Sequence, residues 1–151
     1  MSLLRSIIAI GAIVFAAPVL AQETRSFTDD AGRTVNIPAD PQRIASLQDL
    51  SITIPLIELG VHPVASHGRT TEAGEGFIRS SKVLTGVDFD NSDIAFVGNL
   101  PVDIEAVAAA EPDLIITTPW QTAPVEQLES IAPTIVLDDT VRGDFGMYEA
   151  L

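Results

Sequence analysis

The sequence predicts an α/β fold: a mostly parallel sheet flanked by helices, with a β-hairpin at its N-terminal end. Short apolar runs alternate with helical patterns along the chain, which is typical of strands joined by right-handed crossover helices. The run Leu114-Ile115-Ile116 is apolar on successive residues, as in a strand that is buried on both faces of a parallel sheet. Turn residues such as Gly60 separate the successive elements.

The hairpin is predicted at residues 25–38, because strand residues such as Phe27 and Val35 flank the turn sequence Asp30-Ala31-Gly32. Residues 67–93 are rich in Gly, Ser, Thr and Asp, so we expect a mainly irregular excursion there, with a short helix near Phe77. The parallel strands are expected at 43–47, 64–66, 95–97, 114–116 and 134–137, and the helices at 51–59, 103–111 and 124–131.

The helix expected after residue 102 carries clear end signals. Asp103 has a short acceptor side chain suited to an N-cap, and Glu105 lies in the first turn, where negative charge meets the positive end of the helix dipole. Val107 lies on the apolar face. Pro112 is expected to end the helix, because the residue before a proline is pushed out of the α region.

The first 21 residues are predicted to be a cleaved secretory signal peptide. Arg5 precedes an apolar run at 7–15, and Val19-Leu20-Ala21 supplies a cleavage site of small residues. The alternative is an uncleaved membrane anchor, but the apolar run is far short of the roughly 20 residues that span a bilayer. The chain has no cysteine, hence no lipid-attachment cysteine, disulfide or thiolate metal site. We therefore expect a protein that diffuses freely in a periplasm.

The chain is strongly acidic, with 8 Lys and Arg against 21 Asp and Glu and a formal net charge of −13. Nucleic-acid binding is disfavoured, because neutralising phosphates needs clustered Lys and Arg. The acidic residues are scattered among apolar segments, so most of them are expected to cover a solvated surface. The roughly 130 residues that follow the signal peptide are enough for one domain with a single core.

Several segments resemble, in order, the periplasmic substrate-binding proteins for ferric siderophores, haem and cobalamin. Residues 100–116 resemble the family pattern G-x-x-x-(S/D)-x-E-x-I-x-x-x-x-P-D-L-I, and residues 27–44 resemble its opening hairpin and first core strand. Residues 59–64 resemble its L-G-x-x-P-V turn, and residues 131–136 its I-x-P-T-V-V entry to the last strand of a lobe. The resemblance implies one lobe of a binding protein whose two lobes are joined by a long helix.

The resemblance also implies a division of the chain. After the predicted signal peptide at 1–21, it implies an N-terminal substrate-binding lobe at 22–144 and the start of the inter-lobe helix at 145–151, with the second lobe absent from this sequence. The sequence is then expected to be a fragment or truncated product of a two-lobed protein. The alternative is a lone lobe that serves as an interaction module or is a nonfunctional remnant.

The carboxyl ends of the predicted strands supply the candidate ligand-binding wall, because open parallel sheets bind ligands outside those ends. In chain order these ends carry Gln48 and Asp49, His67 to Arg69, Gly98 and Asn99, Thr117 to Gln121, and Asp138 and Asp139.

Five residues on or near this wall are candidate ligand contacts. Trp120, the only tryptophan, has the flat apolar face and N–H donor that large conjugated or chelate ligands use. Arg69 and Arg79 are donors for an anionic ligand such as a ferric catecholate, ferric citrate or haem propionate. The resemblance implies an aromatic ligand contact at Phe96. Asn99 falls near a position where some hydroxamate-binding relatives carry arginine, which weakens a hydroxamate assignment.

Each candidate also has a purely structural interpretation. Trp120 can pack against the lobe or cap its edge, and Phe96 can lie in the core. Arg69 and Arg79 can each pair with a carboxylate such as Glu72.

Other site chemistries are poorly supported by the sequence. His62 and His67 are the only histidines and are expected at opposite ends of a strand, which disfavours a bare-metal site. Asp88, Asp90 and Asp93 lack the glycine and terminal glutamate of a calcium loop, so a solvated loop is expected there. No nucleophile elbow, P-loop or dinucleotide fingerprint is present, so neither an enzyme activity nor a cofactor is predicted.

The resemblance implies a carrier protein. It would be the periplasmic solute-binding component of an ABC importer, binding a ferric siderophore or related iron chelate and delivering it to the inner-membrane permease. A haem or cobalamin carrier is the alternative. In the family, the glutamate that matches Glu105 is an exposed docking point for arginines of the permease, so Glu105 is expected to have that role.

Overall fold

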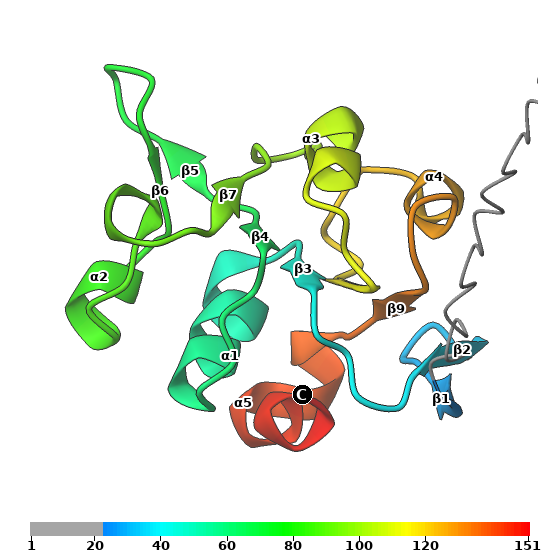
Figure 1. Cartoon of the computed structure of the whole chain (residues 1–151). Helices are drawn as coiled ribbons and strands as arrows, with labels where there is room; N and C mark the ends of the chain where they lie inside the picture. Colours follow the sequence, from blue (N-terminus) through cyan, green and yellow to red (C-terminus); the bar gives the residue numbers. More distant parts are fainter. Residues whose placement is uncertain (1–22) are drawn as a thin grey trace, which may run out of the picture.

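The structure is a computed structural model that describes residues 23–151 (Figure 1). The signal peptide predicted at 1–21 lies outside the described residues. The strands are β1 (Thr24–Thr28), β2 (Thr34–Pro38), β3 (Ile44–Ser46), β4 (Ala65–Ser66), β5 (Arg69–Thr70), β6 (Gly76–Phe77), β7 (Ala95–Phe96), β8 (Leu114–Thr117) and β9 (Thr134–Val136). The helices are α1 (Ile54–Glu58), α2 (Ser81–Leu84), α3 (Ile104–Ala109), α4 (Val125–Glu129) and α5 (Asp139–Ala150), with a π-helical turn η1 (Asp49–Thr53) and a 3-10 turn η2 (Phe89–Asn91).

Five strands form one parallel sheet in the order β7-β4-β3-β8-β9. This confirms the predicted fold class, and each of the five strands lies where the sequence places it. β3 and β8 are central, so Ala45 pairs in register with Ala65 on one side and with Ile115 on the other. Because all five strands run the same way, their carboxyl ends meet at one edge of the sheet.

The sheet is covered on both faces, with α3 and α4 on one side and α1 and α5 on the other (Figure 1). Alternate residues of β8 supply the two cores. Ile115 packs with Val107 of α3 and Leu128 of α4. Leu114 and Ile116 belong to the opposite cluster, which includes residues of α1 and α5. The unbroken apolar run of β8 therefore reflects burial on both faces, as predicted.

Two carboxylates in the hairpin turn fix β1 and β2 to the edge of the sheet. The buried Asp29 Oδ2 accepts hydrogen bonds from Val136 N at 3.1 Å and from Arg33 Nη2 at 2.6 Å. Asp30 Oδ2 accepts from Asp138 N at 2.8 Å and from Arg142 Nε at 2.5 Å. Burial alone would raise the pKa of Asp30, but these hydrogen bonds, together with the charge of Arg142, outweigh it and lower the pKa.

Residues 67–93 are more regular than the sequence predicts. They contain the antiparallel pair β5–β6, which projects from the body, followed by α2 and η2 (Figure 1). Phe77 lies in β6, so the short helix predicted near it is wrong, and the helix begins instead at Ser81. Gly68 explains the tight packing at the base of this hairpin, because a Cβ there would lie 2.6 Å from both the Phe77 carbonyl oxygen and the Phe89 ring.

The solvated loop predicted around Asp88 is wrong for Asp88 itself. This residue is buried, and its Oδ1 accepts hydrogen bonds from Ile78 N and Phe89 N, each at 2.8 Å. The carboxylate therefore N-caps η2 and ties it to the end of the β5–β6 hairpin. Asp90 and Asp93 are exposed, as the solvated loop requires.

Helix α3 begins as predicted, with Asp103 Oδ1 accepting from Glu105 N at 2.9 Å and from Ala106 N at 3.1 Å. Its end differs, because the helix stops at Ala109, before the proline at 112 takes effect. Glu111 has a left-handed backbone with φ of 47°, which breaks the helix, and the Arg43 side chain donates to the released carbonyl of Ala110 at 2.6 Å.

The last helix, α5, covers the sheet on the side of α1 and η1. It starts at Asp139 and is interrupted at Gly143, which has φ of 65°, so it consists of two helical pieces. Met147 of its second half is buried in the core. Across residues 23–151, no helix has both the length and the apolar character that crossing a membrane requires.

Replacing Ile115 by alanine is expected to destabilise the chain by about 2–5 kcal/mol, because its fully buried side chain would leave a cavity at the centre of the sheet. Urea denaturation followed by circular dichroism measures the change. The matched control is Val83→Ala, whose side chain is 89% exposed and which should change stability by less than about 0.5 kcal/mol. Similar losses in the two variants would contradict the assigned core.

Candidate functional site

A pocket of about 90 Å³ lies at the carboxyl edge of the sheet, where the sequence places the ligand-binding wall. The ends of β3, β4 and β8 contribute to it, together with side chains from the 67–93 segment and from the loop after β7. Its lining residues are Leu47, Gln48, His67, Arg69, Arg79, Leu100, Thr118, Trp120 and Gln121. The pocket is far smaller than the roughly 300–1,000 Å³ of a complete ligand site, so by itself it has room for one group of a larger ligand.

Polar atoms without protein partners gather at this edge. Among the described residues, five buried side-chain polar atoms make no hydrogen bond. Four of them belong to residues just after β4 or at the end of β8. They are His67 Nδ1, Arg69 Nε, Thr117 Oγ1 and Thr118 Oγ1. Leaving such atoms unpaired costs about 1–3 kcal/mol each, so a folded chain retains them chiefly where another molecule completes the hydrogen bonds.

Asp49 organises the floor beneath the pocket. It is the first residue of η1, three positions after the end of β3, and is completely buried. Arg79 donates two hydrogen bonds to its carboxylate, from Nε to Oδ2 at 2.7 Å and from Nη2 to Oδ1 at 2.5 Å. The amide of Leu50 donates a third, to Oδ1 at 3.0 Å. This bidentate pair holds the 67–93 segment against the end of the central strand.

The electrostatics of Asp49 follow from this geometry. Burial alone would raise the pKa of the Asp49 carboxyl. The hydrogen bonds and charge of Arg79, together with the nearby His67 ring, outweigh that effect and hold the pKa well below its ordinary value. The carboxylate is therefore ionised throughout the physiological range and neutralises the Arg79 guanidinium.

His67 lies between two acceptors. Its Nε2 is 3.1 Å from Asn99 Oδ1, and its Nδ1 is 3.6 Å from Asp49 Oδ1, which is too long for a hydrogen bond. Asn99 is fixed in turn by Gln121, whose Nε2 donates to its backbone carbonyl at 3.2 Å. The predicted candidate Asn99 thus orients His67 from behind the pocket and is absent from the pocket lining.

Trp120 stands at the rim of the pocket with 57% of its surface exposed. Its indole Nε1 donates to Asp139 Oδ1 at 3.2 Å, which links the loop after β8 to the start of α5. Because the N–H is already bonded, the group that Trp120 offers to a ligand is its apolar face.

The structure brings together three of the five residues predicted as ligand contacts: Arg69, Arg79 and Trp120 all line the pocket. Phe96 is separate. Its half-buried ring packs against Phe89 with centroids 5.1 Å apart and covers Gly76. The sequence missed Leu47 and Leu100 as lining residues, although Leu100 directly follows the predicted wall residue Asn99.

A larger hollow of about 630 Å³ lies at the opposite, amino edge of the sheet. Its lining includes His62, which precedes β4, whereas His67 follows β4, so the two histidines do occupy opposite ends of that strand. Its Arg43 side chain is occupied by the carbonyls of Ala110 and Glu111, at 2.6 and 2.7 Å. Among the residues that line this hollow, no buried side-chain polar atom lacks a partner. We therefore place the candidate site in the smaller pocket.

Metal-ligating side chains do not converge in the part of the chain that the structure describes. No group of three or more His, Cys, Asp and Glu side chains within residues 23–151 has an arrangement that could hold a metal ion.

Replacing Asp49 by asparagine is expected to destabilise the chain by about 1.5–3 kcal/mol near neutral pH, because the charge-assisted bonds to Arg79 are lost. The folded-state pKa lies below the ordinary value of 3.8, so the contribution of the carboxylate is complete above that value and is lost as the pH falls toward the folded-state pKa. Urea denaturation should therefore give a constant difference between wild type and variant from about pH 7 to pH 5, and a shrinking one below about pH 4.

The control for this prediction is Asp90→Asn, which removes an exposed carboxylate paired with Lys82. It should change stability less than Asp49→Asn between about pH 5 and pH 7, because solvent screens the exposed pair. A difference for Asp49→Asn that does not depend on pH would contradict the assigned role of the carboxylate.

Comparison with curated proteins identifies a relative. The probable siderophore-binding lipoprotein YfiY of Bacillus subtilis is 32% identical over 122 residues, which are 78% of this chain and 34% of the relative. The chain thus spans about a third of the length of the curated relative it matches. No family model matches the chain.

Three solved structures share the fold. Unliganded FhuD2 from Staphylococcus aureus is 30% identical with a TM-score of 0.64, and the match covers 85% of this chain and 41% of that one. SirA from Staphylococcus aureus, complexed with staphyloferrin B, is 29% identical with a TM-score of 0.60, covering 80% and 38%. The iron uptake ABC transporter substrate-binding protein PiuA from Streptococcus pneumoniae is 25% identical with a TM-score of 0.60, covering 86% and 42%.

The relatives whose names state a role are binding proteins, and the matches cover between 78% and 86% of this chain. The share of each relative that is covered fits a single lobe. The chain is therefore similar in sequence and fold to part of a siderophore-binding lipoprotein and of an iron uptake ABC transporter substrate-binding protein, over about a third to two fifths of their length.

Proposed function

We propose that the chain is the N-terminal lobe of a periplasmic protein that binds a ferric siderophore or related iron chelate and delivers it to an ABC importer permease. The observation that supports this most directly is the cluster of buried, unpartnered polar atoms beside the pocket at the carboxyl edge of the sheet. The relationship to siderophore-binding proteins supports the class of ligand.

The lining chemistry fits a large chelate with anionic groups. Trp120 offers an exposed apolar face, and two arginines converge on the pocket from the 67–93 segment. Guanidinium groups bind carboxylate or catecholate oxygens through charge-assisted hydrogen bonds. The small volume of the pocket fits a role as one wall of a site whose other wall comes from a second lobe.

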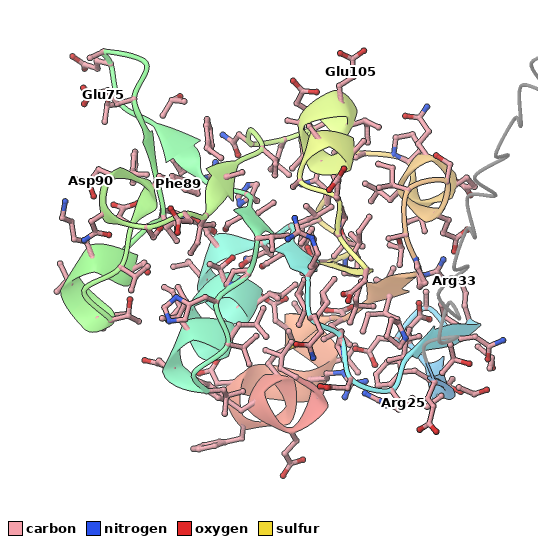
Figure 2. All side chains as sticks on the ribbon, viewed as in Figure 1. Arg25, Arg33, Glu75, Phe89, Asp90 and Glu105 are labelled. Atoms are coloured by element: carbon pink, nitrogen blue, oxygen red, sulfur yellow. The ribbon has the colours of Figure 1, made fainter. Side chains whose placement is uncertain are left out.

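Delivery would involve the exposed surface of α3. Glu105 points away from the sheet into solvent in the first turn of this helix (Figure 2). Within residues 23–151 its carboxylate makes no hydrogen bond or ion pair, so the side chain is available to a partner. We propose that Glu105 docks onto arginines of the permease and takes no part in ligand binding, since it is absent from the pocket lining.

Titration of the chain with ferric siderophores, ferric citrate, haem and cobalamin is expected to change the Trp120 emission for the true ligand, because the indole face loses contact with water. Trp120→Ala should lower the affinity for that ligand by about 0.5–1.5 kcal/mol, measured by calorimetry. The control is Phe145→Ala, which removes an aromatic ring that is 89% exposed and lies outside the pocket. An unchanged emission at saturating ligand would remove Trp120 from the site, and a response to haem or cobalamin alone would change the proposed ligand class.

Glu105→Gln is expected to reduce uptake of a radiolabelled ferric chelate in cells whose only copy of the protein carries the change, while ligand affinity in solution stays the same. The physical reason is that the lost charge lies on the outer surface of α3, away from the pocket. The loss in folding stability should be only about 0.3–1 kcal/mol, the contribution of a first-turn acid.

The matched control is Glu126→Gln, which removes an equally exposed first-turn acid from the neighbouring helix α4. It should leave uptake at the wild-type level. If Glu105→Gln also leaves uptake unchanged while stability falls, Glu105 acts only at the helix end.

A further inference from the structure

Two arginines line the pocket, and their surroundings differ. Arg79 is bound through two hydrogen bonds to the buried Asp49 carboxylate, so its positive charge is cancelled within hydrogen-bonding distance. Arg69 forms no ion pair with any residue that the structure describes, and its Nε is buried without a hydrogen-bond partner. The guanidinium of Arg69 therefore brings an uncompensated charge to the pocket, whereas the Arg79–Asp49 pair is electrically neutral.

A second unpartnered donor lines the same pocket. Thr118 follows β8, is only 3% exposed, and its Oγ1 makes no hydrogen bond. A hydroxyl and a guanidinium can together satisfy a carboxylate or catecholate oxygen. Arg79 differs from Arg69 because the Asp49 carboxylate takes its Nε and Nη2 donors, two of its five N–H groups, and cancels its charge.

We infer that Arg69, with Thr118, binds one anionic oxygen group of the ligand, and that Asp49 sets the charge specificity of the site by withdrawing Arg79 from anion binding. This inference rests on the proposed function and assigns unequal roles to two arginines that the sequence treats as equivalent. Its consequence is that the site discriminates between ligands mainly through the charge of Arg69. The Arg79–Asp49 pair is a positioning element that shapes the floor of the pocket.

The test compares two probes that differ in charge: a strongly anionic ferric tris-catecholate and an uncharged ferric tris-hydroxamate. Both are titrated by calorimetry against wild type, Arg69→Gln and the double variant Asp49→Asn/Arg79→Gln. The quantity of interest is the ratio of the two affinities, because damage to the fold lowers both affinities together and leaves their ratio unchanged. The double variant replaces a neutral ion pair by a neutral amide pair, which avoids leaving a buried charge without its partner.

Arg69→Gln is expected to lower the affinity for the catecholate by about tenfold or more, with little effect on the affinity for the hydroxamate. The ratio of the catecholate affinity to the hydroxamate affinity therefore falls by a similar factor. The double variant is expected to lower both affinities by a similar factor and to keep the wild-type ratio. The matched control Arg25→Gln, at an exposed position in β1, should change neither affinity.

Two results would overturn the inference. The first is a double variant that loses the preference for the catecholate as fully as Arg69→Gln does, because Arg79 would then be the anion-binding residue. The second is Arg69→Gln with an unchanged ratio. If wild type binds neither probe and none of the other iron chelates, the proposed function itself fails and takes the inference with it.

Discussion

The buried carboxylate of Asp49 is the interaction on which the candidate site depends. Asp49 lies at the start of η1, three residues after the central strand β3, and it is completely buried. A buried charge of this kind is tolerated only when it is paired and hydrogen-bonded, and Arg79 supplies both conditions from a residue 30 positions further along the chain. One ion pair thus fixes the floor of the pocket and holds the 67–93 segment at the carboxyl edge, where it contributes Arg69 and Arg79 to the lining.

The two edges of the sheet differ in whether their buried polar groups have hydrogen-bond partners. At the amino edge, Arg43 satisfies the last carbonyls of α3, so polar groups released by the end of that helix are paired. At the carboxyl edge, His67, Arg69 and Thr118 keep buried atoms without partners beside a pocket. The carboxyl edge is also the edge at which open parallel sheets bind ligands, so the unpaired atoms lie where a ligand is expected.

Much of the fold could be predicted because its signals are local. The unbroken apolar run of β8, the N-cap at Asp103 and the turn at Asp30 to Gly32 each depend on neighbouring residues, and each forms in the structure. The prediction weakened in residues 67–93, where the hairpin β5–β6 and the buried Asp88 depend on packing against Phe89 and on bonds to Ile78. Such contacts join residues whose partners have no fixed spacing in the sequence, so no periodic pattern reveals them.

The candidate site, like the fold, could be predicted from the sequence only in part. The sequence by itself determined which residues stand at the carboxyl ends of the strands, because element order and parallel direction are enough to place His67, Arg69 and Trp120 at one edge. Only the tertiary structure decided how those residues pair: that Asp49 neutralises Arg79, that Asn99 supports His67 from behind, and that Phe96 packs on Phe89 outside the pocket. The physical reason is that a hydrogen bond or ion pair depends on distances of a few ångströms between side chains, and these are set by the packing of the whole lobe.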